Sequence, residues 1–139
     1  MGRRYWLLKS DPETFGWDDL ERAKRRRAVW DGVRNYQARN TLRDEVRAGD
    51  GVLFYHSGAE KAVVGTCRVV RGGFPDPTDR DWIAIEIVAD AKLATPVTLD
   101  AMRGIKALAG MALLRRGNRL SVQPVTEGEW KTVAGRLES

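Results

Sequence analysis

The chain has 139 residues, of which 42% are hydrophobic, and these values fit one folded domain spanning residues 1–139 and exclude an intrinsically disordered chain. A single cysteine, Cys67, excludes a disulfide framework and a cysteine-based zinc site. The formal net charge is +5, with 18 Arg against 6 Lys, which favours an anionic partner such as nucleic acid, although a GC-rich genome produces the same bias.

The first segment, residues 1–9, is interrupted by charge too early for a signal peptide, and no apolar run is long enough to span a membrane. We therefore expect a cytoplasmic protein. Residues 4–10 predict a β-strand, which ends at Lys9 and Ser10 because an Asp-Pro pair follows. Residues 17–24 predict a short helix with acids in its first turn and bases in its last. The basic run 24–27 is interpreted as the solvated end of that helix, with a phosphate-binding patch as the alternative.

Residues 30–40, WDGVRNYQARN, hold the densest mixture of aromatic, amide, acidic and guanidinium groups in the chain. This mixture is unsuited to a core, because each buried amide or charge needs a partner. It suits one wall of a pocket for a flat polar ligand, with Trp30 to stack, Asn35 to read a base edge and arginines to neutralise phosphate. The alternative is that Trp30 is an ordinary core tryptophan.

A helix is predicted over residues 36–46, with Asn35 as its N-cap. Its buried face carries Ala38, Leu42 and Val46. A neighbouring basic ridge carries Arg39, Arg43 and Arg47. A bound anion along this ridge would relieve the repulsion between like charges, and so would Asp44 and Glu45 nearby.

Three further strands are predicted over residues 51–56, 62–70 and 82–89, with a loop over residues 72–77. In the second strand, Gly65 marks a bulge or a close backbone approach, and one face carries Val63, Cys67 and Val69, which makes Cys67 an inert core thiol. In the third strand, one face carries Ile83, Ile85, Ile87 and Ala89.

The extended segment after residue 89 is predicted to end at Pro96. Thr98 then caps a short helix that runs through Met102. Residues 105–114 are apolar but show no period that distinguishes helix from strand.

The C-terminal part is predicted to contain a strand over residues 119–123 that Pro124 ends, and a helix that runs to about residue 136. Thr126 and Glu129 match a capping box at the start of this helix. Taken together, these elements predict an α+β domain, with a curved or barrel-like sheet of five to six short strands and surrounding helices.

Polar residues gather at the predicted ends or interiors of three strands, namely Lys9, Ser10, His56, Ser57 and Ser121. Strand ends on one rim of a small sheet can converge around a pocket. With Trp30 as the stacking surface, each stacked base would contribute about 1–3 kcal/mol.

The case for catalysis is weaker. His56 is the only histidine, and no second His or Cys lies at metal-ligand spacing, so we expect no metal site and no cofactor. Ser57 is a poor nucleophile for His56, because neighbouring residues of a strand point to opposite faces. Ser10 and Ser121 lie in no nucleophile-elbow motif. We therefore expect a binding protein rather than an enzyme.

Five blocks carry a resemblance to a known family, and they are residues 5–12, 30–40, 54–57, 74–78 and 120–125. In this order they resemble the EVE domain family, over a match from about Tyr5 to Trp130, and the eleven-residue block is the most specific. The resemblance implies a PUA-like fold and kinship with YTH domains, which hold a methylated adenine in an aromatic cage. It also implies recognition of modified bases, modified cytosine in DNA among them.

Carried over by position, the resemblance implies that Trp30 is the cage residue of a pocket lined by Lys9, Ser10, Val33, Asn35, Tyr36, His56, Ser57, Leu120 and Ser121. Phosphate contacts are expected from Arg34, Arg39 and Arg43. Only residues 79–81 separate the 74–78 block from Trp82, where eukaryotic relatives carry a longer insertion. The chain is therefore expected to hold a strand differently from those relatives, or to bind a smaller ligand.

We accordingly expect a monomeric, non-enzymatic module that binds nucleic acid carrying a modified base, either a modified cytosine or a methylated adenine. One alternative is an enzyme that processes modified nucleotides with His56 and a serine. A second alternative is a sensor of a free nucleotide-like small molecule.

Overall fold

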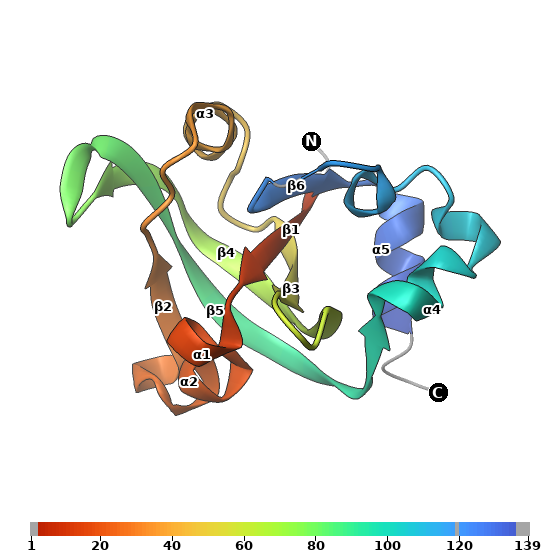
Figure 1. Cartoon of the computed structure of the whole chain (residues 1–139). Helices are drawn as coiled ribbons and strands as arrows, with labels where there is room; N and C mark the ends of the chain where they lie inside the picture. The colour runs from red at the N-terminus through yellow and green to blue at the C-terminus, as the bar shows by residue number, and fades with distance from the viewer. Residues whose placement is uncertain (1–2, 119, 136–139) are drawn as a thin grey trace.

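The computed structural model describes residues 3–118 and 120–135. In this part of the chain, six strands form one mixed sheet in the order β2-β5-β4-β3-β1-β6, in which only β1 and β3 are parallel (Figure 1). The strands are β1 (Tyr5–Ser10), β2 (Arg27–Trp30), β3 (Gly51–His56), β4 (Ala62–Asp76), β5 (Asp79–Thr98) and β6 (Val122–Val125). The predicted α+β class and mixed sheet of five to six strands are confirmed.

Within the described ranges, five α-helices and three short 3-10 turns surround the sheet. The helices are α1 (Pro12–Phe15), α2 (Trp17–Arg22), α3 (Tyr36–Asp44), α4 (Leu99–Arg103) and α5 (Glu127–Ala134). The 3-10 turns are η1 (Lys24–Arg26), η2 (Lys106–Leu108) and η3 (Ala112–Leu114). In Figure 1, α1 and α2 lie beside β2, whereas α4 and α5 lie at the opposite side of the sheet. No helix among the described residues is long and apolar enough to cross a bilayer.

The central strands are buried on both faces, because two hydrophobic clusters sandwich them. Along β1, Trp6 and Leu8 point into a cluster that α2 and α3 cover, and Leu7 points into a second cluster beneath α4 and α5. Each fully buried side chain of this size contributes roughly 1.5–3 kcal/mol by leaving water. The strict alternation along β1 therefore fixes its register against β3.

β4 and β5 form one long, irregular hairpin whose register shifts several times. One shift lies at Gly65, where an added Cβ would approach the Trp17 ring to 2.5 Å, so both features predicted for this glycine are present. The same shift turns Val63 into the second cluster, while Cys67 and Val69 stay in the first. The prediction that Val63 shares their face was therefore wrong. Cys67 is a buried free thiol, and burial raises its pKa.

Several predicted boundaries needed correction. Residues 72–77, predicted as a loop, mostly belong to β4, which continues to Asp76. Pro96 does not end β5, which runs to Thr98. Pro124 lies inside β6, where it is tolerated because β6 is an edge strand. The extended stretch β2 was not predicted at all, and of the strand predicted over 119–123, residue 119 lies outside the described residues.

The helix caps were predicted correctly. Asn35 Oδ1 accepts the Ala38 N–H at 3.0 Å, Thr98 caps α4, and Thr126 and Glu129 form the capping box of α5. α5 ends at Ala134, and residue 136 lies outside the described residues. The apolar segment 105–114 forms 3-10 turns rather than a long helix or strand.

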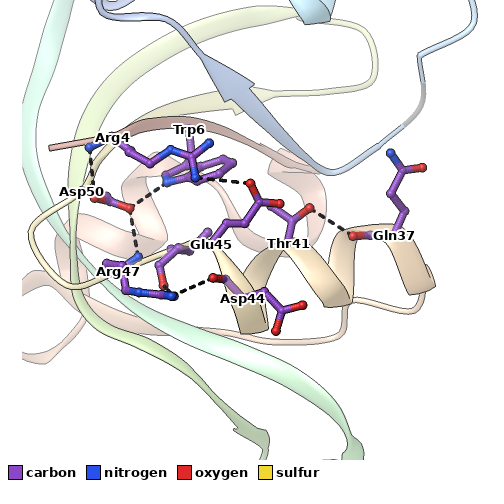
Figure 2. Close-up of polar contacts among 9 residues, drawn as sticks. Arg4, Trp6, Gln37, Thr41, Asp44, Glu45, Arg47 and Asp50 are labelled. Carbon is purple, nitrogen blue, oxygen red and sulfur yellow. Dashed lines mark hydrogen bonds and ion pairs between the residues drawn. The ribbon is translucent and has the colours of Figure 1, made fainter. Parts of the chain in front are cut away.

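The loop that follows α3 is tied to β1 by the buried carboxylate of Asp50 (Figure 2). Its Oδ2 accepts the Trp6 indole N–H at 2.8 Å and the Arg47 N–H at 2.9 Å, and its Oδ1 accepts the Arg4 N–H at 3.2 Å. This anchor holds the C-terminal end of α3, whose buried face carries Ala38 and Leu42, with Val46 buried just beyond. α3 consequently packs against β4, β5 and β6.

Candidate ligand-binding site

A cavity of about 350 Å³, here called the Trp30 cavity, opens beside the ends of β1 and β2. β2 and β6 are the opposite edges of the sheet, yet the cavity is lined both by the end of β2 and by Ser121, which directly precedes β6. The curvature of the sheet therefore brings its two edges together around this space. The lining residues are Lys9, Ser10, Asp11, Thr14, Phe15, Val29, Trp30, Asp31, Gly32, Val33 and Ser121.

Two aromatic side chains contribute to the lining. Trp30 is half-buried and packs against the first hydrophobic cluster while also lining the cavity, so it serves both the core and the site. Phe15 is the second aromatic residue, and it is the last residue of α1. The Ser10 hydroxyl donates a hydrogen bond to the Phe15 carbonyl, and Asp11 caps α1 by accepting the Glu13 N–H at 3.0 Å. Ser10 thus positions Phe15 as well as lining the cavity.

Polar groups surround these aromatic walls. The Lys9 N–H donates to the Ser121 carbonyl at 2.9 Å, and Lys9 Nζ donates to the Asn118 carbonyl at 3.4 Å. The Ser121 hydroxyl and the Trp30 indole N–H make no hydrogen bond with any described residue. The exposed carboxylate of Asp31 is an acceptor at the same rim. The cavity therefore offers both donors and acceptors to a polar ligand.

The wall formed by residues 31–33 is held by a buried carboxylate from the tip of the β4–β5 hairpin. Asp76 Oδ2 accepts the Gly32 N–H at 2.9 Å and Arg34 Nη1 at 3.1 Å, and its Oδ1 accepts the Thr78 N–H at 2.7 Å and the Thr78 hydroxyl at 2.6 Å. Burial opposes ionisation of Asp76, but these hydrogen bonds outweigh it and hold its pKa well below its usual range. Gly32 has a φ of +79°, a conformation that glycine adopts without strain.

The three arginines expected to contact phosphate all have partners within the protein. Arg34 bonds to Asp76 and, at 3.2 Å, to the Thr78 hydroxyl, so its guanidinium fastens the cavity wall to the hairpin. Arg43 pairs with the neighbouring Asp44 at 2.8 Å. Arg39 bonds to Asn40 and lies 4.9 Å from the Tyr36 ring centroid. Asp44 was predicted as one group that could offset the repulsion between the arginines of α3, and the structure shows this pairing at Arg43.

Other predicted site residues lie outside the Trp30 cavity. Asn35 is committed to capping α3, and Tyr36, which is 66% exposed, stacks on Trp82 with a centroid separation of 5.0 Å. Leu120 is half-buried, and its carbonyl accepts the Gln123 side-chain amide at 2.8 Å. Ser57 lines a different cavity, described below.

His56 lies at the end of β3 beside Ser10, as the strand pairing requires, but the α1–α2 junction covers it. Its Nε2 accepts the Trp17 N–H at 3.0 Å, and its Nδ1 lies 2.7 Å from Glu60 Oε1. With Nε2 as the acceptor, Nδ1 carries the proton and donates to Glu60. Both ring nitrogens are therefore engaged, and neither is bonded to a serine. No group of three potential metal ligands occurs among the described residues.

Sequence reasoning missed some lining residues that directly adjoin predicted ones. Asp11, Thr14 and Phe15 follow Ser10 along the chain, and Val29 precedes Trp30. The Asp11-Pro12 pair, read only as a strand breaker, was the available signal, because Asp followed by Pro is also a helix start. Asp76 lay in the quoted 74–78 block, but nothing local indicated that its carboxylate reaches Gly32.

Comparison with known proteins gives consistent matches over nearly the whole chain. The family model described as EVE domain matches residues 4–136. Mouse thymocyte nuclear protein 1 is 32% identical over 169 residues, covering 97% of this chain and 74% of that protein. The solution structure of a Rhodopseudomonas palustris protein is similar with a TM-score of 0.88 and 41% identity, covering 97% of this chain and 93% of that one.

A structure of human THYN1 in complex with 5-methylcytosine-containing DNA is also similar. Its TM-score is 0.88 at 27% identity, and the match covers 98% of both chains.

Proposed function

Because the chain belongs to the EVE domain family, we propose that it is a non-enzymatic module that takes one modified base of a nucleic acid into the Trp30 cavity. The observation that carries this proposal is a cavity with two aromatic residues, apolar side walls and unengaged polar groups at its rim. The complex of human THYN1 with 5-methylcytosine-containing DNA supports it, since that protein shares the fold.

The size of the cavity limits the ligand to about one base. Its volume of about 350 Å³ lies near the lower end of the range for small-molecule sites, roughly 300–1,000 Å³. A duplex cannot enter, so the base must come from a single strand or be flipped out, at a cost of a few kcal/mol. Stacking on Trp30 would offset roughly 1–3 kcal/mol of that cost.

The chemistry of the walls favours a base that carries an amino group and a methyl group. Carboxylates such as Asp31 accept hydrogen bonds from the exocyclic amine of cytosine. Val29 and Val33 supply apolar surface for a methyl group, whose burial contributes about 0.8 kcal/mol. A modified cytosine and a methylated adenine both meet this description, whereas thymine would place a carbonyl oxygen against the carboxylate.

The test is the Trp30→Ala variant, measured by fluorescence anisotropy with matched oligonucleotides. One pair contains cytosine or 5-methylcytosine at a single position, and the other contains adenine or N6-methyladenine. Loss of a stacking contribution of about 1–3 kcal/mol corresponds to about a 5- to 150-fold loss of affinity, and the preference for the modified base should disappear. Trp30→Phe is the matched control, since it keeps an aromatic face and should retain most of the preference.

Circular dichroism must show that both variants stay folded, because Trp30 also packs against the core. If the alanine variant keeps the wild-type preference for the modified base, Trp30 does not contact that base and the proposal is wrong.

The volume of the cavity also fits a free modified nucleotide, so a small-molecule sensor is the second candidate. The two functions differ in salt dependence. Binding to a strand releases counterions and weakens steeply with salt, whereas binding of a mononucleotide weakens much less. A mononucleotide that binds as tightly as the matched oligonucleotide at every salt concentration would favour the sensor.

A further inference from the structure

Among the residues that the structure describes, a second cavity, of about 490 Å³, is lined by five basic residues and by no acidic residue. We call it the basic cavity, and its cationic members are Lys9, Lys61, Arg103, Arg115 and Arg116. It lies between the end of β3, the start of α4 and the segment that follows η3. Tyr55, Ser57 and Asn118 add polar groups to its lining.

Four of these charges, those of Lys61, Arg103, Arg115 and Arg116, are poorly compensated within the described part of the chain. Among the described residues, no carboxylate forms an ion pair with Lys61, Arg115 or Arg116, and the nearest carboxylate oxygen to Arg103 is that of Asp100 at 3.9 Å. Like charges that converge in this way repel one another, and the repulsion is stronger near protein than in bulk water. A bound anion would relieve it. Arg43 of α3 differs in this respect, because it already pairs with Asp44.

The Tyr55 hydroxyl adds a neutral donor to this site. It makes no hydrogen bond with any described residue, although the side chain is largely buried and lines the cavity. Burial raises the pKa of Tyr55, and the positive charge of Arg103 only partly opposes this, so the hydroxyl keeps its proton at neutral pH. A protonated phenol beside several cations suits an oxyanion.

The basic cavity adjoins the Trp30 cavity, because Lys9 lines both. The chain segment between them is fixed to the same residue: Lys9 Nζ donates to the carbonyl of Asn118, which lines the basic cavity, and the Lys9 N–H donates to the carbonyl of Ser121, which lines the Trp30 cavity. A ligand with a base in the Trp30 cavity and an anionic group in the basic cavity would therefore pass beside Lys9.

We propose that the basic cavity binds a backbone phosphate of the nucleic-acid strand, next to the nucleotide whose base occupies the Trp30 cavity. This inference rests on the proposed function for the location of the base. Arg forks and Lys ammonium groups are the side chains that neutralise phosphate, and a strand that leaves the Trp30 cavity past Lys9 meets them next. The main phosphate contacts are thereby assigned to Arg115, Arg116, Lys61 and Arg103 instead of to α3.

The experiment compares two double variants that remove the same charge from exposed positions. Arg115→Ala with Arg116→Ala changes the basic cavity, whereas Lys24→Ala with Arg27→Ala changes the basic run from η1 to the first residue of β2. Affinity of the full chain for single-stranded oligonucleotides with cytosine or 5-methylcytosine is measured between about 50 and 300 mM salt. On single strands, each lost phosphate contact lowers the slope of log K against log salt by about 0.7.

We expect the Arg115/Arg116 variant to lose about 1.4 in slope and roughly tenfold or more in affinity at low salt, for plain and modified strands alike. The Lys24/Arg27 variant should lose less than about 0.5 in slope. Equal losses in the two variants, or an unchanged slope in the first, would overturn the inference. A cavity that takes only free phosphate would give that unchanged slope, together with thermal stabilisation of the wild type by inorganic phosphate.

Failure of the proposed function looks different. In that case the wild type prefers neither 5-methylcytosine over cytosine nor N6-methyladenine over adenine, while the two slopes on the plain strand still decide whether the basic cavity binds phosphate.

Discussion

The carboxylate of Asp76 offers the sharpest test of how the ligand site is held. Each of its oxygens accepts two hydrogen bonds, from Gly32 and Arg34 on one side and from the N–H and hydroxyl of Thr78 on the other. In Asp76→Asn, one oxygen becomes an amide nitrogen, which cannot accept. Turned toward Gly32 and Arg34, this nitrogen faces two donors. Turned toward Thr78, it faces the Thr78 N–H, while the Thr78 hydroxyl can rotate and accept from it. At least one hydrogen bond is therefore lost, and the remaining ones lose their charged acceptor.

The expected cost follows from the lost hydrogen bond and the lost charge. Hydrogen bonds to charged groups contribute about 1.5–3 kcal/mol each and neutral ones about 0.5–1.5 kcal/mol, so losing one bond and weakening the others should lower the free energy of unfolding by about 3 kcal/mol. For a chain of 139 residues, an unfolding entropy of about 2.1 cal/mol/K per residue converts this to a fall in Tm of about 10 °C. Asp81→Asn is the matched control, because it removes the same charge from an exposed position in β5, near the tip of the hairpin. It should change Tm by less than about 2 °C.

The pH dependence gives a second readout. Folding lowers the pKa of Asp76, so the carboxylate stabilises the fold at pH values above the unfolded-chain pKa of about 4. That stabilisation is lost as the pH falls through the folded-state pKa. The Tm difference between wild type and Asp76→Asn should therefore be full at pH 7 and pH 5 and shrink below about pH 4.

Differential scanning calorimetry at pH 7, 5, 4 and 3 would measure both effects. A variant that melts like the wild type at pH 7, or a Tm difference that does not depend on pH, would refute the assignment of Asp76 as an ionised anchor. Because the anchor holds Gly32, the variant should also bind modified and plain oligonucleotides more weakly by a similar factor.

Two further substitutions test the core and the catalytic alternative. His56→Ala leaves the buried Trp17 N–H without its acceptor and should cost about 1–3 kcal/mol of stability, measured by urea unfolding, while preserving the preference for the modified base. Loss of that preference in a folded variant, or product formation by the wild type alone, would favour an enzyme. Gly65→Ala places a Cβ about 2.5 Å from the Trp17 ring and should cost at least about 1–3 kcal/mol, whereas Gly128→Ala, with no atom within 4 Å, should be neutral or slightly stabilising.

Features set by short stretches of chain were predictable from the sequence. The caps at Asn35, Thr98 and Thr126 depend on residues within three positions, and the structure contains all of them. The apolar face of the 82–89 segment likewise fixes local burial. These signals were enough to predict the fold class, because each can be recognised within a single helix or strand.

Features set by pairing between distant segments were not predictable in the same way. Residues 72–77 contain two glycines and two prolines, which indicate a loop. β4 nevertheless continues to Asp76, and residues 74–76 pair with β5, because the hairpin supplies partners through several register shifts. The sequence likewise did not indicate which side of β3 packs against α2. His56 was placed on the correct rim, but the Trp17 N–H covers it, and only the packing of α2 against the sheet decides that.

Residues 30–40 were predicted as a ligand-contacting turn over residues 30–35 followed by the start of a helix, and the structure divides the turn further according to the partner of each residue. Trp30, Gly32 and Val33 line the cavity, whereas Arg34 holds them to Asp76 and Asn35 starts the helix behind them. The polar mixture that made this stretch unsuited to a core is thus largely satisfied within the protein. A wall fixed in advance loses little conformational freedom when a base enters, which favours affinity without choosing among bases. The preference for a modified base must then come from Trp30 and the rim of its cavity, and the affinity for a strand must come from the basic cavity. Substitutions at Trp30 or the rim should therefore change the preference among bases, whereas substitutions in the basic cavity should change the affinity for all strands.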